Sequence, residues 1–206
     1  NHNVILVTST ISGEGKTFVA TNLAVSLALL DKRVVVVGLD IRRPKLLECF
    51  GFSHEEIKGK KGITNYLSDN SIDLHSLLIS AKNNSNLYIL PAGTIPPNPA
   101  ELIARPALDT AIKLLAEEFD YVILDSAPVG LVSDALASRL ADITLYICRA
   151  DYSHKSDFDL INDLKKKQKL PEMAIIVNGI NMKKKKYGYY YGYGQRDYRG
   201  YYSKGR

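Results

Sequence analysis

Residues 8–18 read TSTISGEGKTF, and their types and spacing suit the binding of a phosphate group. Gly13 and Gly15 allow backbone N–H groups to turn inward around an anion. A helix that begins near Lys16 would add the positive end of its dipole. The Lys16 ammonium would supply a charge for the outer phosphate oxygens, and the Thr17 hydroxyl is a hard oxygen ligand for Mg²⁺.

The strict phosphate-loop pattern G-x-x-x-x-G-K-[ST] begins with glycine, whereas this chain has Thr10 at that position. A surface turn with a chance Lys-Thr pair is the alternative interpretation. An apolar strand-like run precedes the loop, and helical spacing of apolar residues follows it. Because strand, loop and helix occur in the order that phosphate binding needs, we favour the binding site.

Two aspartates at predicted strand ends would complete a Mg²⁺–nucleotide site. Asp40 lies in VVVVGLDIRRP and Asp125 in YVILDSAP, each following an apolar run. Ligands of parallel sheets bind at the carboxyl ends of the strands. Mg²⁺ usually takes one or two carboxylates together with phosphate and water. Either aspartate alone would more often be a cap or a turn former, but with the loop they predict a metal-assisted phosphate site.

Strands that alternate with helices must hold these residues in place. Short apolar runs are typical of strands buried on both faces, and the intervening segments show helical periodicity. The order predicts an α/β fold in which a mostly parallel central sheet carries helices on both faces. The expected strands are Val4–Val7, Val34–Val37, Leu87–Leu90, Tyr121–Leu124, Ile143–Cys148 and Ala174–Val177, the expected helices are Lys16–Leu30, Pro106–Phe119, Ser133–Leu140 and Lys155–Lys169, and shorter amphipathic pieces are Ile63–Leu67 and Leu74–Ile79.

Composition and charge narrow the function classes. The length of 206 residues suits one domain, and no apolar run is long enough to span a membrane. Cys49 and Cys148 lack metal-ligand spacing and are expected to be buried, reduced thiols of a cytosolic domain. The chain starts at Asn1, close to a strand, and has no signal peptide, which indicates a fragment of a longer protein.

The net charge of +5 is unevenly distributed. Residues 183–206 hold eight Lys and Arg against Asp197, which gives +7, and the remaining 19 basic and 21 acidic residues give 1–182 a net charge of −2. A basic tail does not indicate nucleic-acid binding by the whole domain. The composition change predicts a folded domain over 1–182 and a flexible basic tail over 183–206.

The tail is also rich in tyrosine, and its glycines keep the expected segment flexible. One interpretation is a low-complexity, disordered end without a specific role. The other is a substrate segment, because an extended chain can place a phenol in a catalytic cleft. We therefore expect the cluster to accept phosphate. Its members are Tyr187, Tyr189, Tyr190, Tyr191, Tyr193, Tyr198, Tyr201 and Tyr202.

Taken in order, the motifs resemble those of the bacterial tyrosine kinases (BY-kinases), the cytoplasmic domains of the polysaccharide co-polymerase family that governs capsule and exopolysaccharide export. The phosphate loop, the strand ending in D-x-R-R-P, the stretch GTIPPNPAELI and the strand ending in D-x-x-P carry the resemblance over about residues 3–181. The nucleotide motifs are common to the deviant P-loop ATPases of MinD/ParA-like fold. The PPNPAEL stretch and the tyrosine tail are specific to the kinase branch.

The resemblance implies an ATP- and Mg²⁺-dependent tyrosine autokinase that modifies its tail in trans, and it implies a role for each motif residue. The nucleotide would be bound by Ser12, Gly13, Glu14, Gly15, Lys16, Thr17, Phe18 and Asn178, the metal by Thr17, Asp40 and Asp125, and catalysis would use Lys16, Asp40, Asp125 and Arg42. Asn178 would contact adenine, although an asparagine after a strand is often only a turn residue. The expected partners are a neighbouring copy, a membrane-anchored co-polymerase portion at the inner membrane and a cognate tyrosine phosphatase, with no nucleic acid.

The chain departs from the family pattern in two places. Gly38 replaces the first aspartate of D-x-D-x-R, so Asp40 or Asp125 would have to take over its role. We expect Asp40 to accept the proton of the phenol. The E-x-x-R-x-x-R helix that the family uses for ring assembly lies upstream of the strand at which this chain begins, so ring assembly by this chain is in question.

Two other classes share part of the pattern. A ParA/MinD-type ATPase, which toggles its dimerisation by hydrolysing ATP, shares the nucleotide motifs but ends in helices rather than in a Tyr/Gly tail. A non-catalytic binding module with an aromatic tail would not need Lys16, Asp40 and Asp125 together. The kinase therefore remains the preferred interpretation.

Overall fold

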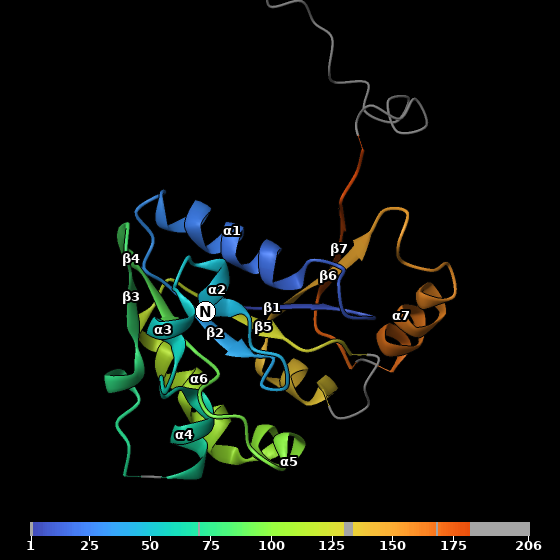
Figure 1. The fold of residues 1–206 in the computed structure, drawn as a ribbon. Coiled ribbons are helices and arrows are strands. Elements are labelled where there is room, and N and C mark those ends of the chain that lie inside the picture. The colour runs from blue at the N-terminus through green and yellow to red at the C-terminus, as the bar shows by residue number, and fades with distance from the viewer. Residues whose placement is uncertain (1, 70, 130–133, 168, 182–206) are drawn as a thin grey trace, which may run out of the picture.

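A seven-stranded sheet crosses the computed structural model, which describes residues 2–69, 71–129, 134–167 and 169–181 (Figure 1). The strand order is β3-β4-β2-β5-β1-β6-β7, and every neighbouring pair is parallel except β3 and β4. This confirms the predicted fold class. The strands are β1 Val4–Ser9, β2 Val34–Leu39, β3 Ile79–Ala81, β4 Asn84–Leu90, β5 Tyr121–Ser126, β6 Ile143–Arg149 and β7 Met173–Asn178.

The four valines of β2 show why the central strands are continuously apolar. Successive side chains of a strand point to opposite faces of the sheet, and both faces are covered here. Val34 and Val36 pack in one core cluster, while Val35 and Val37 pack in the other. All six residues of β2 are buried, so β-branched side chains suit both faces.

Helix α1 (Lys16–Ala28) covers one face of the sheet and lies above it in Figure 1. Ala20, Ala24 and Ala28 recur every four residues, are almost completely buried and pack against this face. Their small side chains let the helix approach the strands closely. The four-residue helix α2 (Leu46–Cys49) adds Leu46 and Leu47 to the same cluster.

Helix α6 (Pro106–Glu118) covers the opposite face and lies below the sheet in Figure 1. Leu108, Ala111, Ile112 and Leu115 are buried at the i, i+3, i+4 and i+7 positions of one helix face. The predicted helix over this segment is therefore confirmed. The other helices are α3 His54–Ile57, α4 Ile63–Ser68, α5 Pro99–Ala104 and α7 Asp157–Lys166, with 3₁₀ turns η1 His75–Leu77 and η2 Asp134–Leu140.

The structure corrects several predicted boundaries. The short strand β3, which pairs antiparallel with β4, was not among the expected strands. Within the expected amphipathic piece Leu74–Ile79, His75–Leu77 forms a 3₁₀ turn and Ile79 begins β3. Where a helix was expected near Ser133–Leu140, the described residues Asp134–Leu140 form 3₁₀ turns rather than an α-helix. Among the described residues no helix is long and apolar enough to cross a membrane. The tyrosine tail lies outside the described residues.

Candidate nucleotide-binding and catalytic site

The loop between β1 and α1 forms a cradle at the carboxyl end of the sheet. Gly13 and Gly15 have φ angles of 89° and 100°, in the left-handed region that favours glycine. A Cβ atom on Gly13 would lie 2.9 Å from the hydroxyl oxygen of Tyr152, and one on Gly15 would collide with the side-chain amide of Asn178. Backbone angle and space therefore both require glycine at these two positions.

The Glu14 carboxylate links the phosphate loop to the residues that follow β6 through hydrogen bonds. Glu14 is completely buried, and its Oε2 accepts a hydrogen bond of 2.9 Å from the backbone N–H of Ile11. Its Oε1 accepts a hydrogen bond from the Ser153 hydroxyl. The predicted nucleotide-binding residue Glu14 thus directs its side chain into the protein, so only its backbone is available to a phosphate.

The sheet order brings together three of the predicted catalytic residues and the predicted metal ligand Thr17. Because β1 lies beside β5, Lys16 and Thr17 at the start of α1 come close to Asp125. The Thr17 hydroxyl donates to Asp125 Oδ1 at 3.2 Å. Because β2 lies on the other side of β5, the backbone N–H of Asp40 donates to the carbonyl oxygen of Asp125 at 3.0 Å. The four residues therefore share one edge of the sheet.

Burial sets the electrostatics of this cluster. The pKa of Asp125 is raised to about 7, chiefly by desolvation, although the Thr17 hydrogen bond and the Lys16 charge oppose the rise. Burial also lowers the pKa of Lys16, and the charges of Asp125, Asp40 and Glu14 act against that lowering. A bound cation would favour the ionised Asp125 carboxylate.

The residues fit a nucleoside triphosphate with Mg²⁺. The cradle excludes side chains at both glycines, as close approach of a phosphate to the backbone requires. Thr17 and Asp125 place two hard oxygen ligands beside each other, and Mg²⁺ needs few protein ligands when phosphate and water supply the rest. Lys16 and the start of α1 add positive charge at the same place.

A hollow beside the loop contains the second predicted motif. Asp40 is partly exposed there, and its Oδ1 accepts a hydrogen bond of 3.1 Å from the backbone N–H of Arg43. Arg42 is exposed on the same wall. The hollow is lined by Thr10, Ile11, Ser12, Asp40, Arg42, Arg43, Ala127, Pro128 and Leu160.

Two predicted nucleotide-binding residues, Phe18 and Asn178, lie differently from what was expected. Phe18 is 61% exposed and its side chain lines a different hollow, which α1 shares with Phe50, so only its backbone belongs to the loop region. Asn178 is the last residue of β7 rather than the residue after it. Its side-chain amide donates to the Glu14 carbonyl oxygen at 3.0 Å, which places it against the loop.

The site contains three further residues that were not predicted from the sequence, Arg149 at the end of β6 and Tyr152 and Ser153 just beyond it. Arg149 Nη1 donates to the Gly13 carbonyl oxygen at 2.9 Å, and the Tyr152 hydroxyl donates to that of Ser12 at 3.0 Å. No motif marks these residues. They reach the loop because β6 pairs with β1 in parallel, and this pairing is set by the tertiary structure.

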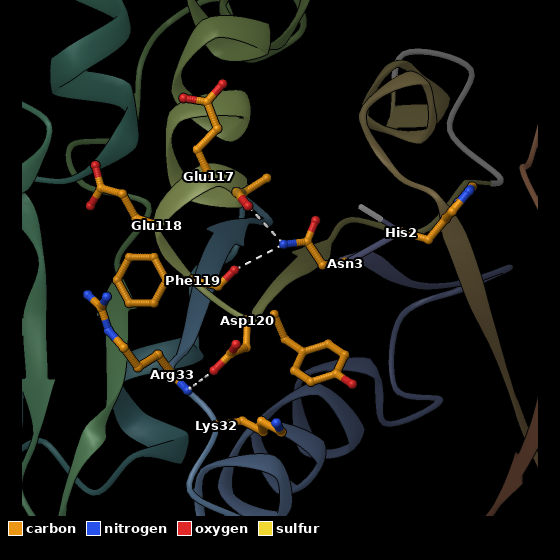
Figure 2. Close-up of a pocket in the computed structure, with 10 residues that line it drawn as sticks. His2, Asn3, Lys32, Arg33, Glu117, Glu118, Phe119 and Asp120 are labelled. Atoms are coloured by element: carbon orange, nitrogen blue, oxygen red, sulfur yellow. Dashed lines mark hydrogen bonds between the residues drawn. The ribbon is translucent and has the colours of Figure 1, made fainter.

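A second hollow lies at the opposite edge of the sheet, before the strands begin (Figure 2). Asn3 donates from its side-chain amide to the carbonyl oxygens of Ala116 and Phe119 there, and the backbone N–H of Arg33 donates to Asp120. These bonds tie the starts of β1 and β2 to the end of α6 and the residues that follow it. Of the predicted site residues that the structure describes, none lines this hollow.

A phosphate cradle between the first strand and first helix of a parallel α/β sheet defines a P-loop nucleotide-binding domain. The family described as AAA domain matches residues 2–178. The MinD cell division protein of Aquifex aeolicus superposes with a TM-score of 0.72 at 24% identity, covering 90% of this chain and 73% of that one. This likeness shows the shared fold.

Closer relatives are kinases by name. Tyrosine-protein kinase CpsD of Streptococcus agalactiae is 30% identical over 197 residues, which cover 95% of this chain and 83% of that protein. The BceF tyrosine kinase domain is 32% identical with a TM-score of 0.74, covering 87% of this chain and 69% of that one. The chain therefore belongs to the bacterial tyrosine kinase family and is a tyrosine-protein kinase domain, as the motifs indicated.

Proposed function

We propose that this chain is an ATP-dependent autokinase that phosphorylates its own C-terminal tyrosine cluster, by transfer between neighbouring copies. The observation that carries the proposal is the convergence of Lys16, Thr17, Asp40 and Asp125 on a phosphate cradle. A site that only bound phosphate would not need two carboxylates beside the cradle, because they repel the anion unless a cation lies between them.

We assign each residue a role that its position supports. The backbone of Ser12–Thr17 binds and orients the phosphates, and Lys16 carries positive charge to the oxygens that become more negative during transfer. Thr17 and Asp125 would hold the metal ion, and Arg42 lies at the mouth of the site. ATP with Mg²⁺ supplies the γ-phosphoryl group and the charge that neutralises it. Asp40, which is partly exposed, accepts the proton of the attacking phenol.

The hollow beside Asp40 offers a place for a tyrosine ring. Ile11, Pro128 and Leu160 provide apolar walls, whereas Asp40 lies on the polar side. A phenol has an ordinary pKa of about 10, so it needs a nearby proton acceptor at neutral pH. A ring between these walls would present its hydroxyl to both the carboxylate and the cradle.

The tail supplies the phenols, and its charge makes modification a switch. Residues 183–206 carry +7, and the rest of the chain carries −2. Each phosphate adds about −1.5 to −2 charges, so about four would cancel or reverse the positive charge of the tail. Phosphorylation would thereby change an attractive tail into a neutral or repelled one and alter the contacts between copies.

The proposed setting is the control of capsular or exopolysaccharide synthesis and export. The chain would work as the cytoplasmic domain of an inner-membrane assembly, next to a membrane-anchored co-polymerase portion of the same or a partner chain. A cognate tyrosine phosphatase would reverse the modification, and nucleic acid is no part of the scheme. This setting comes from the family to which the chain belongs.

The test uses Lys16→Met in the full chain. Incubation of the wild type with ATP and Mg²⁺ should add mass in steps of one phosphate, which a tyrosine phosphatase removes and peptide mapping locates within residues 187–202. Lys16→Met should reduce the initial rate by at least about a hundredfold, because a charge aimed at the transferred group is lost. Circular dichroism should remain that of the wild type.

Lys113→Met is the matched control, since Lys113 is exposed on α6, away from the loop. It should phosphorylate like the wild type. Wild-type phosphotyrosine in Lys16→Met would rule out the loop as the catalytic site. ATP hydrolysis without any gain of protein mass would replace the kinase proposal by a nucleotide-switched ATPase of the MinD type.

A further inference from the structure

Three consecutive carbonyl groups of the phosphate loop each accept a hydrogen bond from a side chain that lies at, or just beyond, the end of β6 or β7. The Tyr152 hydroxyl donates to Ser12, Arg149 Nη1 donates to Gly13, and the Asn178 amide donates to Glu14, at 3.0, 2.9 and 3.0 Å. All three donors belong to residues outside the loop.

Peptide geometry gives these bonds a consequence for phosphate binding. In a trans peptide the C=O of one residue and the N–H of the next point in opposite directions. A carbonyl that is held outward therefore turns the following N–H inward. The three bonds orient the N–H groups of Gly13, Glu14 and Gly15, which are the donors of an anion-binding cradle.

The loop needs such support because it contains two glycines. Glycine passes readily between regions of φ and ψ that other residues avoid, so the peptides around Gly13 and Gly15 can rotate at little cost. A rotated peptide would aim a carbonyl oxygen at the phosphate and repel it. Bonds that pin the carbonyls before a nucleotide arrives lower the ordering cost of binding.

Arg149 and Tyr152 also hold each other. The guanidinium carbon of Arg149 lies 5.3 Å from the centre of the Tyr152 ring, within the range of a cation–π interaction. The Tyr152 hydroxyl lies over Gly13, where an added Cβ would come within 2.9 Å of it. The Tyr152 side chain is 44% exposed, so burial in the core does not account for its position.

We propose that Arg149 and Tyr152 are positioning residues that hold the phosphate loop in its anion-binding conformation before a nucleoside di- or triphosphate binds. They act on the loop through its carbonyls and take no part in phosphoryl transfer. This inference rests on the proposed nucleotide site, and the experiment separates the two.

The test is Tyr152→Phe in the full chain, which removes one hydroxyl and keeps the ring. The Kd for ADP with Mg²⁺ should rise roughly three- to tenfold, as expected for one hydrogen bond. The KM for ATP should rise in proportion while kcat at saturating ATP stays near wild type, because bound nucleotide restores the loop conformation. In the nucleotide-free protein, amide hydrogen exchange should become faster in residues 12–16 and stay unchanged in the strands.

Two further variants sharpen the result. Tyr121→Phe, in the remote hollow of Figure 2, removes a hydroxyl at the opposite edge of the sheet and should leave Kd and loop exchange at wild-type values. Arg149→Lys keeps the positive charge but loses the planar guanidinium. It should weaken ADP binding as Tyr152→Phe does, whereas retained affinity would mean that charge alone matters and would overturn the role of Arg149.

Lys16→Met separates failure of the site from failure of this inference. If Lys16→Met abolishes ADP binding and Tyr152→Phe leaves Kd and loop exchange unchanged, the nucleotide site stands and the positioning role is wrong. If Lys16→Met binds ADP normally, the nucleotide site itself is wrong. A fall in kcat at unchanged KM in Tyr152→Phe, or faster exchange throughout the sheet, would also overturn the positioning role.

Discussion

At the scale of single residues, burial and hydrogen bonding decide what each charged group can do. Asp125 is almost fully buried beside Lys16, while Asp40 is partly exposed at the rim. The two aspartates follow similar apolar runs in the sequence, yet their environments differ. The buried carboxylate suits a metal ligand, and the exposed one is better placed to exchange a proton with a substrate and water.

His75 gives a residue-scale prediction that depends on pH. The pKa of His75 is raised mainly by the hydrogen bond of 2.8 Å between its Nε2 and Glu118. Asp73 raises it further. Glu118→Gln should lower this pKa toward its ordinary value of about 6.5. An NMR titration of the imidazole signals measures it.

The sign of the stability effect follows from the raised pKa. The charged pair stabilises the fold fully below the ordinary histidine pKa, and the contribution is lost as pH rises through the higher value in the folded state. Glu118→Gln should therefore destabilise the protein more at pH 5.5 than at pH 8.5. Glu117→Gln is the control, since Glu117 is exposed next to Glu118 on α6, whereas the described side-chain bonds of the His75 ring are to Asp73 and Glu118. An equal loss at both pH values would show that the pair is not ionic.

At the scale of elements, the two helices that flank the sheet differ in their task. Helix α1 packs through small alanines and positions the loop at its first residue, so any shift of α1 moves Lys16. Helix α6 packs through larger aliphatic side chains on the opposite face, away from the phosphate loop. Stability and activity should therefore respond separately to substitutions in α6.

Leu108→Ala tests this separation. Leu108 is completely buried on α6, so its truncation should lower the free energy of unfolding by about 2–5 kcal/mol. Leu114→Ala on the same helix, where the side chain is 38% exposed, should cost less than about 1 kcal/mol. Urea unfolding measures both. Under native conditions the Kd for ADP should stay unchanged in each variant, and a loss of affinity in Leu108→Ala would show that α6 does support the loop.

At the scale of the whole molecule, charge divides the chain more sharply than hydrophobicity does. The first 182 residues carry a net charge of −2 and contain the sheet, and the last 24 residues carry +7 and eight tyrosines. Opposite charges favour an encounter between the tail of one copy and the body of another, and salt should weaken that encounter. Autophosphorylation should therefore slow as ionic strength rises.

Replacement of the eight tail tyrosines by phenylalanine tests the substrate role of the cluster. Most autophosphorylation should be lost, whereas the melting temperature and the Kd for ADP should be kept, because the nucleotide site is untouched. The phosphotyrosine content by mass, the thermal scan and the binding isotherm must be measured on the same preparation. Early unfolding would mean that the tail packs as structure.

Persistent phosphorylation of that variant would move the acceptors to the body of the chain. Tyr146 is the poorest candidate there, because it is completely buried and its hydroxyl is hydrogen-bonded to Thr10 at 2.8 Å. Tyr152 is the most exposed of the five tyrosines in residues 1–182, with 44% of its surface accessible. Peptide mapping would identify the acceptor directly.

The sequence by itself determined the fold class and the phosphate loop. Continuous valines mark a strand buried on both faces, and Gly13, Gly15 and Lys16 mark a cradle, because these properties depend on residues that are neighbours in the chain. The sequence also predicted that Asp40 and Asp125 lie near each other, because both follow apolar strands and the carboxyl ends of parallel strands share one edge of the sheet.

Only the tertiary structure decided which side chains surround the loop. Arg149, Tyr152 and Asn178 are more than 130 residues from the carbonyls that they hold, as the separations of 136, 140 and 164 residues show, and strand pairing alone brings them there. The antiparallel β3 and the 3₁₀ turns of η2 escaped prediction for a related reason. Short segments have weak local preferences, and the packing of the rest of the chain sets their conformation.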